Sequence, residues 1–328
     1  MDRPILILLG TFALAVSCLA QTHPAAKSTS IPRAPDGHPD LQGTWTNATI
    51  TPMERPAGVK ATLSDAEAVD LEKNAAGQLA ADDGASDSPG LRAAGSGGVG
   101  GYNILFIDRG SEFARVDGVK RTGLIVDPPD GKVPPVTAAA RERNMALMRN
   151  FNRFGSVKER PAAERCLLSF GSSSGPPMMP VLYNNNYQII QTPETVMILV
   201  EMVHDVRVVR MNGTHPAKNI RLWLGDSTGR WEGDTLVVDT ANFTDQTSFR
   251  GSSPDLHVIE RFTRADATNI LYKVTLDDQS TWAKSWTMEY PFVATSGPVY
   301  EYACHEGNYA ITDILGGARK SDSDAGRK

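Results

Sequence analysis

Short apolar segments alternate with turn clusters along the second half of the chain, from Tyr187 onward. The turn clusters are rich in Gly, Pro, Asn and Asp, which favour chain reversal. Many short strands at this spacing are typical of an antiparallel meander, and closure into a barrel removes exposed strand edges. We therefore predict a mainly β fold with a β-barrel-like (lipocalin-like) domain at 161–315. The expected strands lie near 187–191, 195–201, 204–210, 220–224, 235–240, 256–263, 269–276, 284–292 and 299–304.

The first half of the chain has longer polar stretches and few alternating segments. We expect a Pro- and Ser-rich linker at 21–42, followed by an irregular segment at 43–160 that wraps the barrel. Within that segment, short apolar runs predict strands at 102–107 and 124–126. A polar tail is expected at 316–328.

Two stretches of the first half have helical spacing. One covers 62–80, where Thr62 or Ser64 is placed to cap the helix. The other covers 137–152, with Thr137 as the cap. The N-terminal half is therefore expected to contribute short helices beside the barrel.

Residues 1–20 have the pattern of a secretory signal peptide. Arg3 precedes an apolar run at 5–16, which is shorter than the ~20 residues of a membrane span, and Ala20 marks the cleavage site. The alternative is a lipoprotein signal, in which Cys18 carries the lipid. Because no later apolar run approaches spanning length, we expect a periplasmic or extracellular protein without stable membrane insertion.

Cleavage of this leader changes the cysteine count of the protein. The chain has three Cys, and removal of Cys18 from the pool of free thiols leaves Cys166 and Cys304. An even pair in an oxidising compartment predicts a disulfide between them. The alternative is a catalytic thiol at Cys304, beside His305 and Glu306.

Charge and motifs restrict the partners. The chain carries 33 Lys and Arg against 38 Asp and Glu, a formal net charge of −5. This acidic balance argues against a nucleic-acid partner, which needs a basic face. No HxH or HExxH spacing indicates a metal site. The glycine cluster at 95–101 lacks the strand–helix context of a nucleotide-binding loop, so no cofactor is expected, and the sequence leaves the oligomeric state open.

One expected strand, 196–209, is strongly β-forming and yet carries several charges. Period-two alternation places Glu201 and Arg207 on one face and His204 on the other. A turn or bulge near Val203 would break this parity and bring His204 beside Glu201. If the charged face lies inside the barrel, these three residues are candidate catalytic groups. If it faces outward, the charges are simply solvated.

Further polar side chains follow or interrupt the neighbouring strands. In a barrel they would surround the same lumen and orient a substrate, whereas in an ordinary sheet they belong to one wet face. His305 near the last expected strand is either a general base or a solvated histidine beside the disulfide. The candidate substrate-binding residues are Tyr187, Asn242, Asp245, Glu260, Arg261 and His305.

Several segments resemble a family of uncharacterised secreted bacterial proteins common in soil bacteria. They include 101–103, 108–110, 121–131, 164–166, 187–193, 229–236, 242–243, 260–262 and 301–304. The resemblance covers most of the mature chain and implies family membership without implying a reaction. Its Arg-Cys and Tyr-x-Cys segments fit the pairing of Cys166 with Cys304. Gly123 stands where the resemblance implies Ser, which suggests that this position is not catalytic.

From these features we predict a secreted enzyme that uses acid–base chemistry, as a lyase, isomerase or hydrolase, on a small polar organic substrate. A glycoside or plant aromatic fits this class. Glu201 or His204 would be the acid or base, and Arg207 or Arg261 would hold developing negative charge. The alternative is a non-catalytic barrel that binds a small ligand, and a filled barrel would indicate a structural envelope protein.

Overall fold

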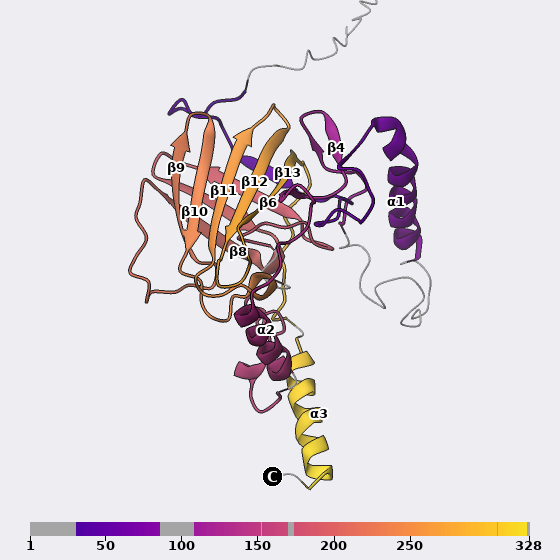
Figure 1. The fold of residues 1–328 in the computed structure, drawn as a ribbon, viewed down its shortest axis with the longest axis vertical. Coiled ribbons are helices and arrows are strands. Elements are labelled where there is room, and N and C mark those ends of the chain that lie inside the picture. The colour runs from indigo at the N-terminus through magenta and orange to yellow at the C-terminus, as the bar shows by residue number, and fades with distance from the viewer. Residues whose placement is uncertain (1–30, 86–107, 152, 170–173, 307, 327–328) are drawn as a thin grey trace, which may run out of the picture.

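The computed structural model describes residues 31–85, 108–151, 153–169, 174–306 and 308–326. The predicted signal peptide and the strand expected at 102–107 lie outside these ranges. Figure 1 shows the described part as a barrel, with α1 beside it and α2 and α3 extending from one end.

Nine strands close into a barrel in the order β1-β6-β7-β8-β9-β10-β11-β12-β13, because β1 pairs with both β6 and β13. This confirms the predicted mainly β, barrel-like fold. The short strand β5 (Ile125–Asp127) adds to β13 outside the closed ring. The ring strands are β1 (Gly43–Thr46), β6 (Asn186–Gln191), β7 (Thr195–Val200), β8 (Asp205–Met211), β9 (Asp226–Glu232), β10 (Thr235–Ala241), β11 (His257–Arg264), β12 (Asn269–Asp277) and β13 (Trp286–Ala294).

The ring differs from the predicted meander in three places. β8 and β9 pair in parallel, whereas the other ring pairs are antiparallel. Residues 220–224 form no strand and contribute only an isolated bridge between Leu222 and Phe243. Residues 299–304 form no strand either, and the closing strand comes instead from β1, which lies outside 161–315.

β9 lies where a turn cluster was expected, because its sequence Asp-Ser-Thr-Gly-Arg-Trp-Glu is polar and contains glycine. Close packing of β9 against the parallel strand β8 explains the glycine at position 229. A Cβ atom at Gly229 would lie 2.7 Å from Met211 Sδ and 2.8 Å from Val209 Cγ1, so a side chain would collide with β8. Pairing with β8 and β10 therefore overrides the weak strand propensity of this segment.

The three helices lie outside the ring (Figure 1). They are α1 (Asp65–Ala85), α2 (Ala138–Phe151) and α3 (Ala310–Asp324), and α3 runs through much of the segment expected as a polar tail. Short 3-10 turns occur at η2 (Val157–Glu159), η4 (Met202–His204) and η5 (Phe249–Gly251). A small sheet in the order β2-β4-β3 joins α1 to the barrel side, with β2 (Thr62–Leu63), β3 (Arg115–Val116) and β4 (Val119–Arg121).

The expected helix caps are present. Ser64 and Glu67 form a capping box, in which Ser64 N donates to Glu67 Oε2 at 2.8 Å and Glu67 N to Ser64 Oγ at 3.4 Å. Thr137 Oγ1 accepts a hydrogen bond from Ala140 N at 3.0 Å. Because Thr62 pairs in β2, the capping residue of the first helix is Ser64.

Alternate residues of the ring strands point into one aromatic core. Tyr187, Tyr272, Tyr290, Phe262 and Phe292 are fully buried there and contact one another at ring separations of 4.9–6.4 Å. The aromatic rings thus occupy much of the space that an open lumen would need.

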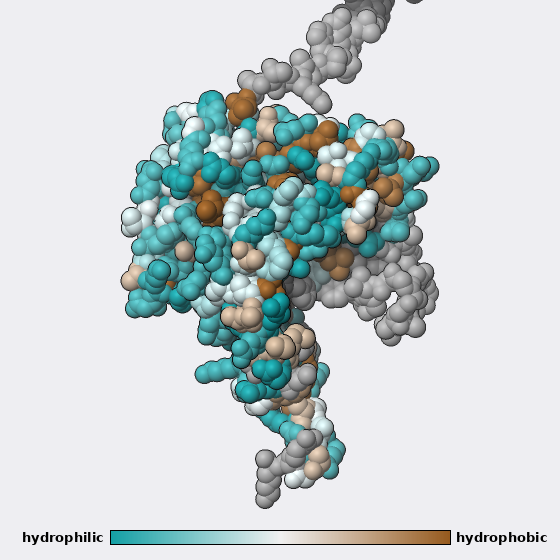
Figure 2. All heavy atoms as spheres, in the orientation of Figure 1, coloured by the Kyte–Doolittle hydropathy of each residue, from teal (hydrophilic) through white to brown (hydrophobic). Residues whose placement is uncertain are grey.

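A disulfide joins Cys166 and Cys304, with the two Cα atoms 5.8 Å apart. The predicted pairing is confirmed, and Cys304 is not a free thiol. The bond ties the 163–168 segment to the chain that follows β13. No helix in the described ranges has the length and apolar character to cross a membrane. Figure 2 shows a largely hydrophilic face, on which hydrophobic residues gather in small groups.

Candidate functional site

Arg207 on β8 and Glu260 on β11 meet inside the barrel. Arg207 Nη1 donates to Glu260 Oε1 at 3.0 Å and Nη2 donates to the second carboxylate oxygen, while the Tyr272 hydroxyl donates to Oε1 at 2.8 Å. Burial on its own would lower the pKa of Arg207, but the charge and hydrogen bonds of Glu260, with smaller contributions from Tyr272 and Tyr187, raise it above the ordinary value. The ionic side chains are 1% and 0% exposed, so neither is open to a substrate.

A loop at 174–179 covers this ion pair. Met178 N donates to the Tyr272 hydroxyl at 3.2 Å, and Met178 O accepts from the Tyr290 hydroxyl at 2.7 Å and from Asn47 Nδ2 at 2.8 Å. Gly175 passes so close that a Cβ atom there would lie 3.5 Å from Arg207 Cδ. The loop and the aromatic core together enclose the interior polar groups, which points to a structural role for them.

Glu201, at the end of β7, is also buried, but it belongs to a different network. Its carboxylate accepts from Asn186 Nδ2 at 2.9 Å, from Asn186 N at 3.2 Å and from Tyr300 N at 2.8 Å. The side chain is 1% exposed. Glu201 therefore fastens the start of β6 and the chain after β13 to the end of the barrel.

The turn expected near Val203 is present. Val203 and His204 have left-handed φ values of 68° and 57°, and η4 interrupts the alternation between β7 and β8. The side chain of His204 remains exposed. Among the described contacts, no side-chain hydrogen bond joins Glu201, His204 and Arg207, so the structure does not assemble them into one constellation.

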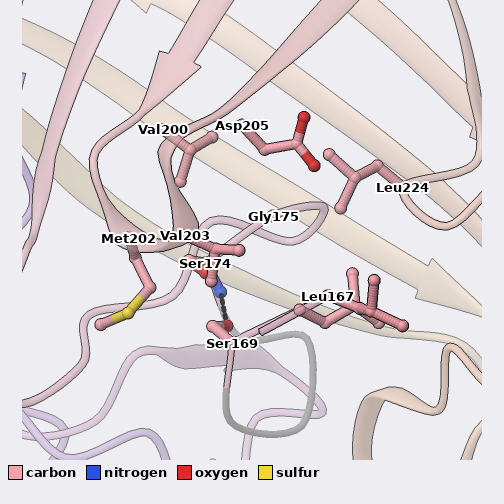
Figure 3. A pocket seen from close by; sticks show the side chains of 10 residues that line it. Leu167, Ser169, Ser174, Gly175, Val200, Met202, Val203, Asp205 and Leu224 are labelled. Atoms are coloured by element: carbon pink, nitrogen blue, oxygen red, sulfur yellow. Dashed lines mark hydrogen bonds between the residues drawn. The ribbon is translucent and has the colours of Figure 1, made fainter. Parts of the chain in front are cut away.

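A cavity of about 10 Å³, the space of a single water molecule, lies beside this turn (Figure 3). The β7–β8 connection bounds one side, and Ser169 and Ser174, joined by a hydrogen bond of 3.0 Å, bound the other. The cavity is too small for an organic substrate. The labelled residues around it are Leu167, Ser169, Ser174, Gly175, Val200, Met202, Val203, Asp205 and Leu224.

The other residues predicted for a common site are dispersed. Tyr187 lies in the aromatic core, and Arg261 forms an ion pair with Glu232 on the outer face. Asp245 lines a cavity of about 430 Å³ near α2. Asn242 donates from Nδ2 to Pro216 O at 3.2 Å, and His305 is exposed beside the disulfide.

Asp108 is a carboxyl group that the sequence did not single out as a site. Its backbone N donates to Leu182 O at 3.0 Å, next to the segment that leads into β6. Burial raises the pKa of Asp108 to about 6, and the negative charge of Glu201 adds to this rise. No hydrogen bond to the Asp108 carboxylate occurs among the described contacts, so ionisation of this group is poorly compensated.

We expect Asp108→Asn to stabilise the protein at about pH 8 by about 1 kcal/mol, after allowance for solvent screening of this partly exposed group. Because the folded-state pKa lies above the unfolded value, the wild type loses stability as pH rises between about 4 and about 6. Urea unfolding at about pH 4 and about pH 8 checks this, with exposed Asp245→Asn as the control. Equal effects of Asp108→Asn at both pH values would contradict the assignment.

A cluster of histidines and aspartates occupies the outer face of the barrel. His215 Nδ1 lies 2.7 Å from Asp226 Oδ2, and His215 Nε2 lies 3.1 Å from Asp239 Oδ1. His257 Nε2 contacts the same Asp239 oxygen. Asp226 is held in turn by Arg210, at 2.6 and 3.0 Å. We call His215, Asp226, Asp239 and His257 the outer His–Asp cluster.

Four elements position this cluster. Asp226, Asp239 and His257 come from the neighbouring strands β9, β10 and β11, on the face opposite the core. His215 comes from the connection between the parallel strands β8 and β9. The hydrogen bond from Asn242 to Pro216 fastens that connection to the end of β10. The strands are rigid, so the spacing of Asp226, Asp239 and His257 is fixed.

The cluster is electrostatically coupled and accessible. The hydrogen bond that His257 donates to Asp239 raises the pKa of His257 above its ordinary value, although burial opposes the rise, and the charge of Asp277 on β12 adds to it. Burial on its own would raise the pKa of Asp239, but the hydrogen bonds and charges of His257 and His215 together outweigh burial and lower the pKa. The side chains of His215, Asp239 and His257 are 28%, 27% and 37% exposed, so solvent and small molecules reach them.

None of these four residues was among the candidate site residues predicted from the sequence. His257 alternates with Ile259 and Arg261 along one face of its expected strand, and Asp239 interrupts an otherwise apolar strand, which is a usable signal. His215 and Asp226 lie between expected strands, where strand alternation gives no indication of a site. Within the ranges that the structure describes, no group of three or more His, Cys, Asp or Glu side chains is arranged to hold a metal ion.

Comparison of the chain with protein-family models, with curated proteins and with solved structures finds no match.

Proposed function

We propose that the protein is an acid–base enzyme, a lyase, isomerase or hydrolase, acting at the outer His–Asp cluster on a small polar organic substrate such as a glycoside or plant aromatic. The observation that carries the proposal is the convergence of His215 Nε2 and His257 Nε2 on one oxygen of Asp239. Imidazole is the side chain best suited to proton transfer near neutral pH.

The contacts suggest distinct roles for the two histidines. His215 faces a carboxylate with each ring nitrogen, Asp226 with Nδ1 and Asp239 with Nε2, so neither nitrogen is left for a substrate. His257 contacts Asp239 through Nε2 and is the most exposed member of the cluster. We therefore assign His257 as the group that exchanges a proton with substrate and Asp239 as the residue that orients it.

The disulfide supports the proposal that the protein is exported to the periplasm or the extracellular space. Disulfides form and persist in oxidising compartments and are rare in the cytosol. The alternative of a lumenal ligand site has less support, because the interior holds the Arg207–Glu260 ion pair and packed aromatic rings.

Screening against glycosides and phenolics, followed by kinetics of variants, tests the proposal. We expect His257→Gln to lower kcat/KM by about a hundredfold, the effect of losing a general acid or base. The exposed His305→Gln is the control and should stay within about twofold. If His204→Gln abolishes turnover while His257→Gln does not, the outer cluster is excluded. A panel without turnover contradicts the proposed substrate class.

The pH profile distinguishes proton transfer from a structural role. If His257 acts as a base, activity rises with pH through its raised pKa, because the neutral imidazole is the active form. Asp239→Asn removes the main cause of the raised pKa. It should shift this limb of the profile to lower pH, and an unshifted limb would contradict the assignment.

A further inference from the structure

A cleft beside the disulfide has no part in the proposed acid–base site. Its volume is about 630 Å³, which is the size of a small-molecule pocket. The cleft is lined by the chain around Glu164, which we call its first wall, by Glu301, Tyr302 and Glu306, which we call its second wall, and by Tyr183 and Asn184.

Covalent and polar contacts hold the two walls together. The disulfide between Cys166 and Cys304 spans them. Asn308 Nδ2 donates to Glu164 O at 3.2 Å and contacts Cys166 Sγ at 3.3 Å. The hydrogen bond from Tyr300 N to Glu201 fixes the second wall to the barrel end. The cleft is therefore built from parts that are cross-linked to the barrel.

Asn184, which lines the cleft, has a side chain that takes no part in the contacts between the walls. It is only 8% exposed, and its carboxamide makes no hydrogen bond among the described contacts. The backbone at Asn184 is left-handed, with φ 57°, a conformation that Asn tolerates better than most residues. Because Asn184 lines the cleft, its amide is available to form a hydrogen bond with a ligand there.

The charges around the cleft favour a positive ligand. Three glutamates line it, and none of the described lining residues is Lys or Arg. Arg160 neutralises Glu164, with hydrogen bonds at 2.8 and 2.9 Å, which leaves Glu301 and Glu306 as exposed charges. Tyr183 and Tyr302 supply aromatic surface, which attracts cations as well as apolar groups.

We propose that this cleft binds a small organic cation, an amine that carries an apolar or aromatic portion. The ammonium group faces Glu301 and Glu306, the amide of Asn184 forms a hydrogen bond with the ligand, and the tyrosine rings contact its apolar portion. The site is separate from the outer His–Asp cluster and does not depend on the function proposed for it.

Three probes that share one phenol ring test the charge of the ligand. Tyramine is a cation, 4-ethylphenol is neutral and 3-(4-hydroxyphenyl)propionate is an anion, and calorimetric titration at low salt compares their affinities for the oxidised protein. We expect tyramine to bind about fivefold more tightly than 4-ethylphenol and the anion to bind weakest. Added salt should weaken the binding of tyramine but not that of the other two probes.

Variants locate the binding in the cleft. The double variant Glu301→Gln/Glu306→Gln should weaken the binding of tyramine about fivefold and leave the affinity for 4-ethylphenol unchanged. The matched control Glu142→Gln/Glu194→Gln makes the same change of net charge on α2 and at the β6–β7 turn and should have no effect. Asn184→Gly removes the amide at a position where glycine accepts the positive φ, and it should weaken tyramine about threefold.

Three results would overturn the proposal. They are the absence of saturable tyramine binding, equal affinity for the three probes, and equal effects of the cleft variant and its matched control. Enzyme kinetics at the outer His–Asp cluster provide no information on binding in the cleft. Failure of the acid–base proposal therefore does not affect the tyramine test.

Discussion

Glu260→Gln should lower the free energy of unfolding by about 3–5 kcal/mol, because it leaves the Arg207 guanidinium buried without a counter-charge. The two ionic side chains are 1% and 0% exposed, so water cannot replace the lost partner. Urea or guanidinium unfolding measures the change, with retention of the barrel checked by circular dichroism.

A double variant keeps this prediction testable if the single variant does not fold. Arg207→Met/Glu260→Gln removes the positive charge as well, and buried ion pairs replaced by uncharged groups often cost little. We therefore expect the double variant to be more stable than Glu260→Gln alone. A loss below about 1 kcal/mol in the single variant would show that the pair is not buried as described.

Replacement of Cys166 and Cys304 by serine should cost about 2–5 kcal/mol. The two residues are separated by 138 positions, and cross-linking so long a loop restricts the unfolded chain strongly in the chain-entropy model. Unfolding of the wild type with and without a reductant gives the same comparison without mutation. Intact mass after alkylation of the oxidised protein provides the control, because two alkylated thiols would show that the bond does not form.

Alternation of apolar and polar residues sufficed to predict the strands that bury one clean face. β6, β7, β8 and β10 to β13 lie close to their expected positions. β9 was missed because its pairing depends on strands on both sides and on a glycine at a close contact. β1 was missed as a ring strand because four residues, Gly43–Thr46, carry too little pattern to indicate a partner near the other end of the chain.

The candidate site was harder to predict than the fold. The sequence marked Arg207 and Glu260 as candidate site residues, but their pairing across the barrel depends on tertiary structure. His215 had no local signal, because only the connection between the parallel strands brings it to Asp226 and Asp239. Residues that are joined only by tertiary contacts lie on different strands and loops, so the alternation along one strand cannot predict that they meet.

Closure by β1 also sets the order in which the barrel can be completed. β1 is the first strand of the ring to be synthesised, and its partner β13 ends at Ala294. Until that last ring strand has left the ribosome, β1 and β12 each lack a neighbour, and the partly made chain has unpaired strand edges. Such long-range pairing folds slowly. A nascent chain of this topology stays unfinished until almost its whole length is available, which is a state compatible with passage through a narrow export channel.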